Sequence, residues 1–90
     1  MVFWDESKRE KNFKDHGIDL AGLDCVFGAS MVTVEDGRET YGEQRLQSLG
    51  WFRGPVVFLV WTERDEGPRV ISCRYGDKNE TRAYFKALGY

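Results

Sequence analysis

The stretch from Pro55 to Arg74, PVVFLVWTERDEGPRVISCR, constrains the fold more than any other part of this chain. Two runs rich in β-branched and aromatic residues flank Asp65-Glu66-Gly67-Pro68, which has the composition of a turn. Two such runs separated by a short turn pair as an antiparallel hairpin. The sequence therefore predicts a β-hairpin at the centre of a small sheet.

The register of this hairpin decides which side chains share a face, because a slip of one residue exchanges the two faces. We expect Glu63 to lie opposite Arg69, since the alternative of Arg64 opposite Arg69 would bring like charges together. In the expected register one face is apolar and belongs to the core: Leu59, Trp61, Ile71 and Cys73. The other face carries two hydroxyls and two arginines: Thr62, Arg64, Ser72 and Arg74.

Two helices are predicted before the hairpin. Asp5 is a suitable N-cap for a helix that runs to His16 and ends at Gly17. Asp19 caps a second, short helix whose apolar stripe faces the core. That stripe is Leu20, Leu23, Val26 and Phe27.

Strands and a last helix complete the prediction. Met31–Val34 and 43–49 have strand patterns, and the segment from Asp77 to Glu80 has the spacing of a capping box that opens a C-terminal helix. A short apolar strand at residues 2–4 precedes everything else. The predicted class is α+β, with N-terminal helices and a C-terminal helix packed on one face of an antiparallel sheet of about four strands.

The length of 90 residues, with 41% hydrophobic residues, suits a single domain over residues 1–90. The longest apolar run, Val56 to Trp61, is far too short for a membrane helix, and the N-terminus has no secretory leader pattern, so we expect a cytoplasmic protein. Cys25 and Cys73 lie among apolar neighbours. We expect reduced core thiols rather than a disulfide or a metal site.

Charge is unevenly distributed along the chain, although the net charge is only −2. Residues 19–43 hold six acids and one base, whereas residues 67–90 hold five bases and two acids. A face that binds phosphate is compatible with this pattern, and so is an ordinary solvated surface.

The first predicted helix has an unusual polar line. Lys8, Asn12 and His16 repeat at four-residue spacing, and Phe13 is the only large apolar residue of the helix. This line indicates either a functional surface or a solvated helix in which His16 and Lys14 complement the helix dipole.

Several blocks of the sequence, in this order and spacing, resemble the BrnT family, the toxin half of a type II toxin–antitoxin pair with a RelE-like fold. The blocks cover nearly the whole chain: Phe3-Trp4-Asp5, Lys8, Asn12, Lys14 to Ile18, Phe27, Glu43-x-Arg45, Gly50, Thr62-x-Arg64, Arg69 to Arg74, Glu80 and Tyr84. The chain departs from the family in having Cys73 where alanine is usual, and in its acidic pI of about 5.4.

The resemblance implies a metal-independent endoribonuclease that slows translation and needs no cofactor. It also implies a hetero-oligomer with a cognate BrnA-like antitoxin, which is a ribbon-helix-helix DNA binder. Cleavage by 2′-hydroxyl attack needs a proton acceptor, a proton donor and cations at the phosphate. The catalytic candidates are Arg64, Arg74, His16 and Glu43. The RNA-binding candidates are Lys8, Lys14, Arg45 and Tyr84.

An alternative from another functional class is a protein-binding module of the same fold that pairs with the antitoxin without catalysis. The acidic pI favours this alternative. A plain nucleic-acid-binding domain is less consistent with the sequence, because the strands lack the aromatic pattern of an RNA-recognition motif.

Overall fold

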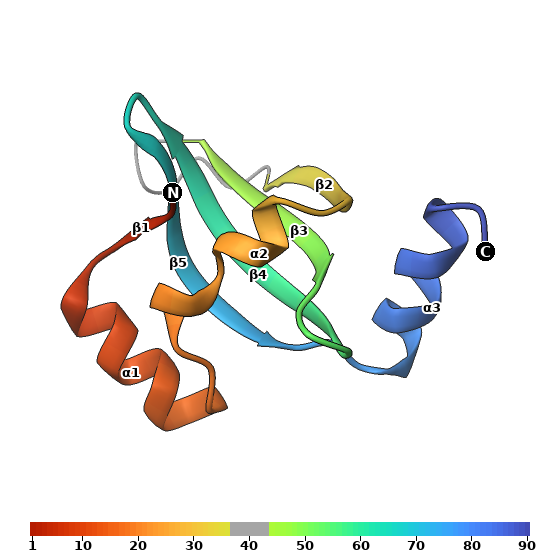
Figure 1. Ribbon diagram of the computed structural model, residues 1–90, viewed down its shortest axis with the longest axis horizontal. Coiled ribbons are helices and arrows are strands. Elements are labelled where there is room, and N and C mark those ends of the chain that lie inside the picture. The colour runs from red at the N-terminus through yellow and green to blue at the C-terminus, as the bar shows by residue number, and fades with distance from the viewer. Residues whose placement is uncertain (37–43) are drawn as a thin grey trace.

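The computed structural model describes residues 1–36 and 44–90 and has an α+β fold (Figure 1). The elements follow in the order β1 (Phe3–Trp4), α1 (Glu6–His16), the 3-10 helix η1 (Leu20–Gly22), α2 (Asp24–Phe27), β2 (Met31–Asp36), β3 (Arg45–Trp51), β4 (Val56–Arg64), β5 (Gly67–Tyr75) and α3 (Lys78–Ala87). The predicted fold class is confirmed.

The strands form one sheet in the order β1-β5-β4-β3-β2. Its members from β2 to β5 are antiparallel, and the short strand β1 pairs with β5 in the parallel direction. The sheet therefore has five strands rather than about four, because the apolar opening of the chain joins its edge.

The central hairpin pairs β4 with β5, and its register agrees with the prediction only up to Val60. Leu59 lies opposite Cys73, as expected, but an irregularity between Val60 and Trp61 shifts the pairing beyond that point. Trp61 consequently faces Val70 rather than Ile71. The expected pairing of Glu63 with Arg69 is wrong, since Pro68 lies opposite Glu63 and Thr62 lies opposite Arg69. A β-bulge of this kind inserts one residue into one strand and cannot be read from alternation alone.

The core lies on the face of the sheet that carries Leu59 and Cys73. Residues from η1, α2 and the central strands form one buried cluster: Val2, Ile18, Leu20, Leu23, Val26, Val57, Leu59, Trp61, Val70 and Cys73. Ile71, which was expected in the core, is only half-buried, and Val70 is buried in its place. Cys73 is a buried free thiol as expected, whereas Cys25 is exposed and not part of the core.

Helix ends follow the predicted caps. The Asp5 side chain accepts a hydrogen bond from the Ser7 backbone, and α1 ends at Gly17, which adopts the left-handed conformation with φ of 72°. Asp77 and Glu80 form a complete capping box at the start of α3. These local signals fix where α1 and α3 begin and end.

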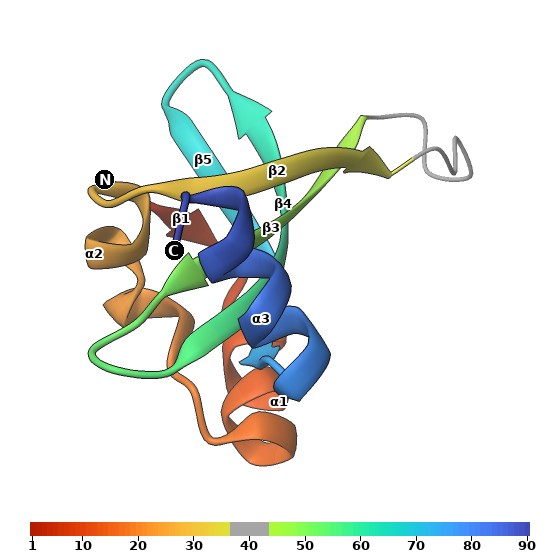
Figure 2. The ribbon, with the colours of Figure 1, turned by 90° about the vertical axis from the view of Figure 1, so that its right-hand side faces the viewer.

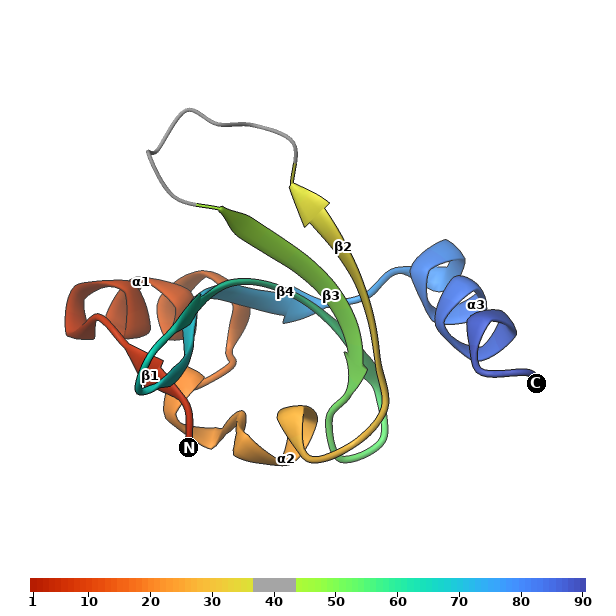
Figure 3. The ribbon, with the colours of Figure 1, turned by 90° about the horizontal axis from the view of Figure 1, so that it is seen from above.

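Helix α3 lies on the opposite face of the sheet from α2, so the prediction that all helices share one face is wrong. Alternation along β4 turns Val56 and Phe58 away from the core face that carries Val57 and Leu59. Arg74 lies opposite Phe58 and forms an ion pair with Glu80 of α3. Seen from above, β2 and β3 run between α2 and α3 (Figure 3), and α3 lies in front of the sheet when viewed from its own side (Figure 2).

Within residues 1–36 and 44–90, no helix has the length and apolar character needed to cross a membrane.

Candidate functional site

The face of the sheet opposite the core carries most of the candidate residues. The register of β4 and β5 sets Phe58 opposite Arg74, Val60 opposite Ser72 and Thr62 opposite Arg69. Alternation along β3 and β4 adds Arg45, Gln47 and Arg64 to the same side. We call this surface the arginine face; its residues are Arg45, Gln47, Phe58, Val60, Thr62, Arg64, Arg69, Ser72 and Arg74.

Arg74 is held firmly on the arginine face by several contacts. Its Nη1 and Nη2 donate to the two carboxylate oxygens of Glu80, each at 2.8 Å, and Nη1 also donates to the Tyr75 carbonyl at 3.2 Å. The guanidinium carbon lies 4.4 Å from the centre of the Phe58 ring. Its hydrogen bonds to Glu80 raise the pKa of Arg74, and the same contacts lower the pKa of Glu80.

Arg64 and Arg45 lie toward the other end of the arginine face. Arg64 Nε is 3.4 Å from the Thr62 hydroxyl oxygen, to which it donates, and Thr62 is buried although it lies on this face. Phe58 marks the level of Arg74, so the Cα atoms of Arg64 and Arg74 are about 20 Å apart along the strand direction. Because Arg74 is held over Phe58 at this distance from Arg64, the two guanidinium groups cannot bind the same phosphate in this conformation.

The polar line of α1 borders the arginine face at β5. A pocket of about 220 Å³ lies between the helix and the strand, lined by Lys8, Lys11, Asn12, Asp15, His16, Ile71 and Ser72. The Lys11 ammonium pairs with the Asp15 carboxylate at 2.8 Å, which lowers the pKa of Asp15. Lys8 and His16 are exposed. The structure thus brings Lys8 and His16 together with Ser72, which precedes Arg74 by two residues on the same face.

Asn12 has a different role from its two neighbours on that line. It is buried, its Nδ2 donates to the carbonyls of Ile18 and Cys73 at 2.9 Å each, and its Oδ1 accepts from the Cys73 N–H at 2.9 Å. The Asn12 side chain thus provides hydrogen-bond partners for the backbone N–H and C=O of β5 beyond the two residues that pair with β1. Asn12 therefore sets how α1, with Lys8 and His16, lies against the sheet.

The remaining candidates are dispersed. Tyr84 is buried on α3, where its hydroxyl donates to the Ser30 carbonyl at 2.9 Å and burial raises its pKa. Its ring is packed rather than open for stacking on a base. Lys14 is exposed in the last turn of α1. Glu43 lies outside the described residues.

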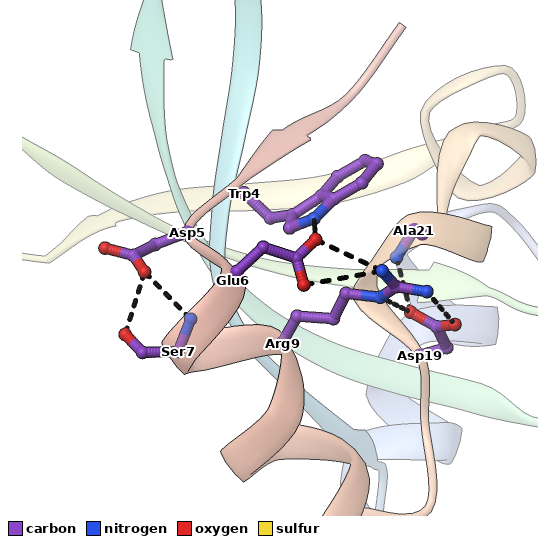
Figure 4. Close-up of polar contacts among 7 residues, drawn as sticks. All are labelled: Trp4, Asp5, Glu6, Ser7, Arg9, Asp19 and Ala21. Carbon is purple, nitrogen blue, oxygen red and sulfur yellow. Dashed lines mark hydrogen bonds and ion pairs between the residues drawn. The ribbon is translucent and has the colours of Figure 1, made fainter.

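The other side of α1 is a closed polar network, drawn in Figure 4. Arg9 donates to both carboxylate oxygens of Asp19, at 2.8 and 3.1 Å, and to Glu6 at 3.1 Å. The Trp4 indole N–H also donates to Glu6 at 2.9 Å, and these hydrogen bonds lower the pKa of Glu6. Arg9 is therefore occupied by two carboxylates, those of Asp19 and Glu6.

Arg69 and Phe58 of the arginine face, and Glu80 beside it, were not among the candidates. Arg69 reaches it only because the bulge in the hairpin shifts its partner from Glu63 to Thr62. Phe58 and Glu80 were not expected because nothing in the sequence joins them to Arg74, although Glu80 was expected in the capping box. Among residues 1–36 and 44–90, no group of three or more His, Cys, Asp or Glu side chains is arranged to hold a metal ion.

Comparison with known proteins agrees with the resemblance drawn from the sequence. The model of a family described as "Ribonuclease toxin, BrnT, of type II toxin-antitoxin system" matches residues 4–80. No curated protein matched the chain by sequence similarity. The matched stretch runs from β1 into the first turn of α3 and includes Lys8, His16, Arg64, Arg74 and Glu80. Because the match covers most of the 90 residues, the chain belongs to the BrnT family of ribonuclease toxins of type II toxin–antitoxin systems.

Proposed function

We propose that this protein is a metal-independent endoribonuclease that slows translation, and that it cleaves RNA at the end of the arginine face next to α1. The observation that carries the proposal is the pocket between α1 and β5, where Lys8 and His16 meet Ser72 on the same face as Arg74. This arrangement places an imidazole, which can act as a general acid or base, on the same side of the sheet as two cationic side chains.

In the proposed reaction the 2′-oxygen of a ribose attacks the adjacent phosphorus. The new bond joins that oxygen to phosphorus, the bond to the 5′-oxygen of the next nucleotide breaks, and the products are a 2′,3′-cyclic phosphate and a 5′-hydroxyl. One proton leaves the 2′-hydroxyl and one reaches the 5′-oxygen, so the step is balanced. The nucleophile belongs to the substrate itself, and the protein's task is proton transfer and charge stabilisation.

His16 is proposed as the acid or the base of this step, and Glu43 as the second proton-transferring group. Arg74 is proposed to stabilise the charge that grows on the phosphate oxygens, since a guanidinium remains charged at every relevant pH. Lys8, which lines the pocket together with His16, is proposed to add a second cation.

Arg64, Arg45 and Lys14 are proposed to hold the RNA backbone away from the reacting phosphate. The separation of about 20 Å between Arg64 and Arg74 suits an extended strand that crosses the face rather than one shared phosphate. Tyr84 is kept as an RNA-binding candidate on the family resemblance alone, and its burial supports a packing role.

Single-turnover cleavage of an unstructured RNA, with a chelator present, tests the catalytic assignment. Arg74→Ala and His16→Ala should each lower the rate by about 10²- to 10³-fold, the usual cost of a lost electrostatic or proton-transfer group. Arg82→Ala is the control, because Arg82 is an exposed arginine of α3 outside the arginine face.

Variants at Arg74 and His16 that cleave as fast as the parent would refute this site. A parent that cleaves no RNA while binding its antitoxin would instead favour the non-catalytic binding module.

A type II toxin has a cognate antitoxin, and we infer that this partner is a BrnA-like ribbon-helix-helix protein that forms a hetero-oligomer with the toxin. Two features of the fold support a tight protein partner: the charged arginine face, and β2 at one edge of the sheet with Val34 59% exposed. Co-expression with the product of the adjacent gene should give a complex that stays together in gel filtration. Separate elution at micromolar concentration would contradict the inference.

A further inference from the structure

We propose that Glu80 is a positioning residue of the ribonuclease site, which holds Arg74 by one edge of its guanidinium and leaves the other edge for the phosphate. The inference rests on the proposed role of Arg74 in phosphate binding. It adds a carboxylate from α3 to a site otherwise built from α1 and the sheet.

The hydrogen-bond inventory of Arg74 carries the argument. A guanidinium has five N–H donors. Three are used, by the two Glu80 oxygens and the Tyr75 carbonyl. Glu80 accepts from Nη1 and Nη2 together, so the carboxylate binds the guanidinium end-on. The donors that remain are Nε–H and one N–H of Nη2, and among the described residues neither has a partner.

These two remaining donors lie side by side on one edge of the guanidinium plane. They form a second fork that matches two oxygens of one phosphate. The Arg74 side chain is 40% exposed, so it is partly open to a ligand. Arg9 makes the contrast clear, because Asp19 takes its Nε–Nη2 edge and Glu6 its Nη1.

Glu80 is itself fixed in place. Its Oε1 also accepts the Asp77 backbone N–H at 2.9 Å within the capping box, and its side chain is only 23% exposed. Phe58 supports the flat side of the Arg74 guanidinium. The orientation of Arg74 is therefore set before any ligand arrives, and little side-chain entropy remains to be lost on binding.

A purely structural reading of the same contact is that Glu80 only anchors α3 to the sheet. Glu80→Gln separates the two readings, because glutamine still completes a capping box but turns an amide N–H₂ toward one of the Arg74 nitrogens. Leu88→Ala is the matched control: Leu88 is half-buried at the C-terminal end of α3, whereas Glu80 lies in its first turn, so the truncation should weaken the packing of the helix and leave the Glu80–Arg74 pair in place.

The cleavage assay gives the first readout. Glu80→Gln should lower the single-turnover rate roughly 10- to 100-fold, as expected for a displaced catalytic cation, whereas Leu88→Ala should leave it within about twofold at a temperature where both are folded. In an Arg74→Ala background, Glu80→Gln should have no further effect, because it acts through the missing guanidinium. Equal effects of Glu80→Gln with and without Arg74 would overturn the proposal.

A second readout does not depend on cleavage. The Arg74 Nη–H signals in NMR spectra should be slow to exchange in the parent, because Glu80 accepts these protons, and the Nε–H signal should shift on addition of a 2′-deoxy oligonucleotide, which cannot be cleaved. In Glu80→Gln both properties should be lost. A signal that behaves the same in the two proteins would overturn the positioning role, whereas a parent that responds as expected but cuts no RNA would overturn only the proposed function.

Discussion

Removing the Asn12 side chain should be among the most damaging single changes in this protein. Asn12→Ala deletes two donors and one acceptor that join α1 to β5 and to the loop at Ile18. The three backbone groups left behind belong to Ile18 and Cys73, each only 1% exposed, so water cannot easily replace the amide.

The expected loss follows from those three groups. A buried polar group without a partner costs about 1–3 kcal/mol, and the lower half of that range, about 1–2 kcal/mol for each of the three groups, gives a total of about 3–6 kcal/mol. Against a total stability of about 5–15 kcal/mol, this is a large fraction. For a domain of this size it corresponds to a fall in melting temperature of about 15 °C or more.

Urea unfolding and thermal melting, followed by circular dichroism, measure this loss. Phe13→Ala is the control, because Phe13 is the next residue of the same helix and is 59% exposed; its cost should stay near 0.5 kcal/mol or below. Asn12→Asp keeps the shape but turns a carboxylate oxygen toward two carbonyls, and should be at least as unstable at neutral pH. If Asn12→Ala unfolds at the same urea concentration as Phe13→Ala, the account of α1 docking is wrong.

Three further outcomes are expected. Trp61→Ala should cost about 3–5 kcal/mol in urea unfolding, because it empties the centre of the core and removes an indole N–H bond to a buried hydroxyl. Gly50→Ala should cost about 1–3 kcal/mol in the same assay, since an added Cβ would lie 2.5 Å from the buried Val26 side chain. The lowered pKa of Glu80, caused first by its bond to Arg74, implies stability that is present above the ordinary value of 4.5 and lost as pH falls through the folded value. The Glu80→Gln protein should therefore have a free energy of unfolding roughly 1 kcal/mol below that of the parent at pH 7. Thermal melts at decreasing pH should show this difference in stability disappear in acid.

The predictable part of the fold is the part governed by local rules. Asp5, Gly17 and the Asp77-to-Glu80 box fixed the ends of two helices, because caps act over a few residues. The composition of the two strands predicted the hairpin. It did not predict the register beyond Val60, because a bulge depends on how the two strands pair and not on the sequence of either strand alone. The side of the sheet on which α3 packs was predicted wrongly for a related reason. The apolar residues of a helix show which side of the helix is buried, but not which face of the sheet covers it.

The candidate site was predictable as a set of residue types and not as an arrangement. Alternation correctly grouped the two arginines and two hydroxyls of the hairpin on one face. Ser72 and Arg74 pair with Val60 and Phe58, on the side of the bulge where the expected register is kept. The partners of those arginines were not predictable. Glu80 reaches Arg74 only through the turn at Gly76, where the chain leaves the sheet and α3 folds back over it.

The unequal edges of the sheet limit how copies of this chain can associate. On one side β5 is closed by the two-residue strand β1 and then by the Asn12 side chain, while on the other side β2 ends the sheet. A filament built by strand addition needs two open edges on every molecule, one to give and one to receive. A molecule with one usable edge can join only one neighbour in this way, so edge pairing ends at a symmetric pair across β2. The fold thus protects a free toxin from runaway polymerisation while leaving one strand able to pair.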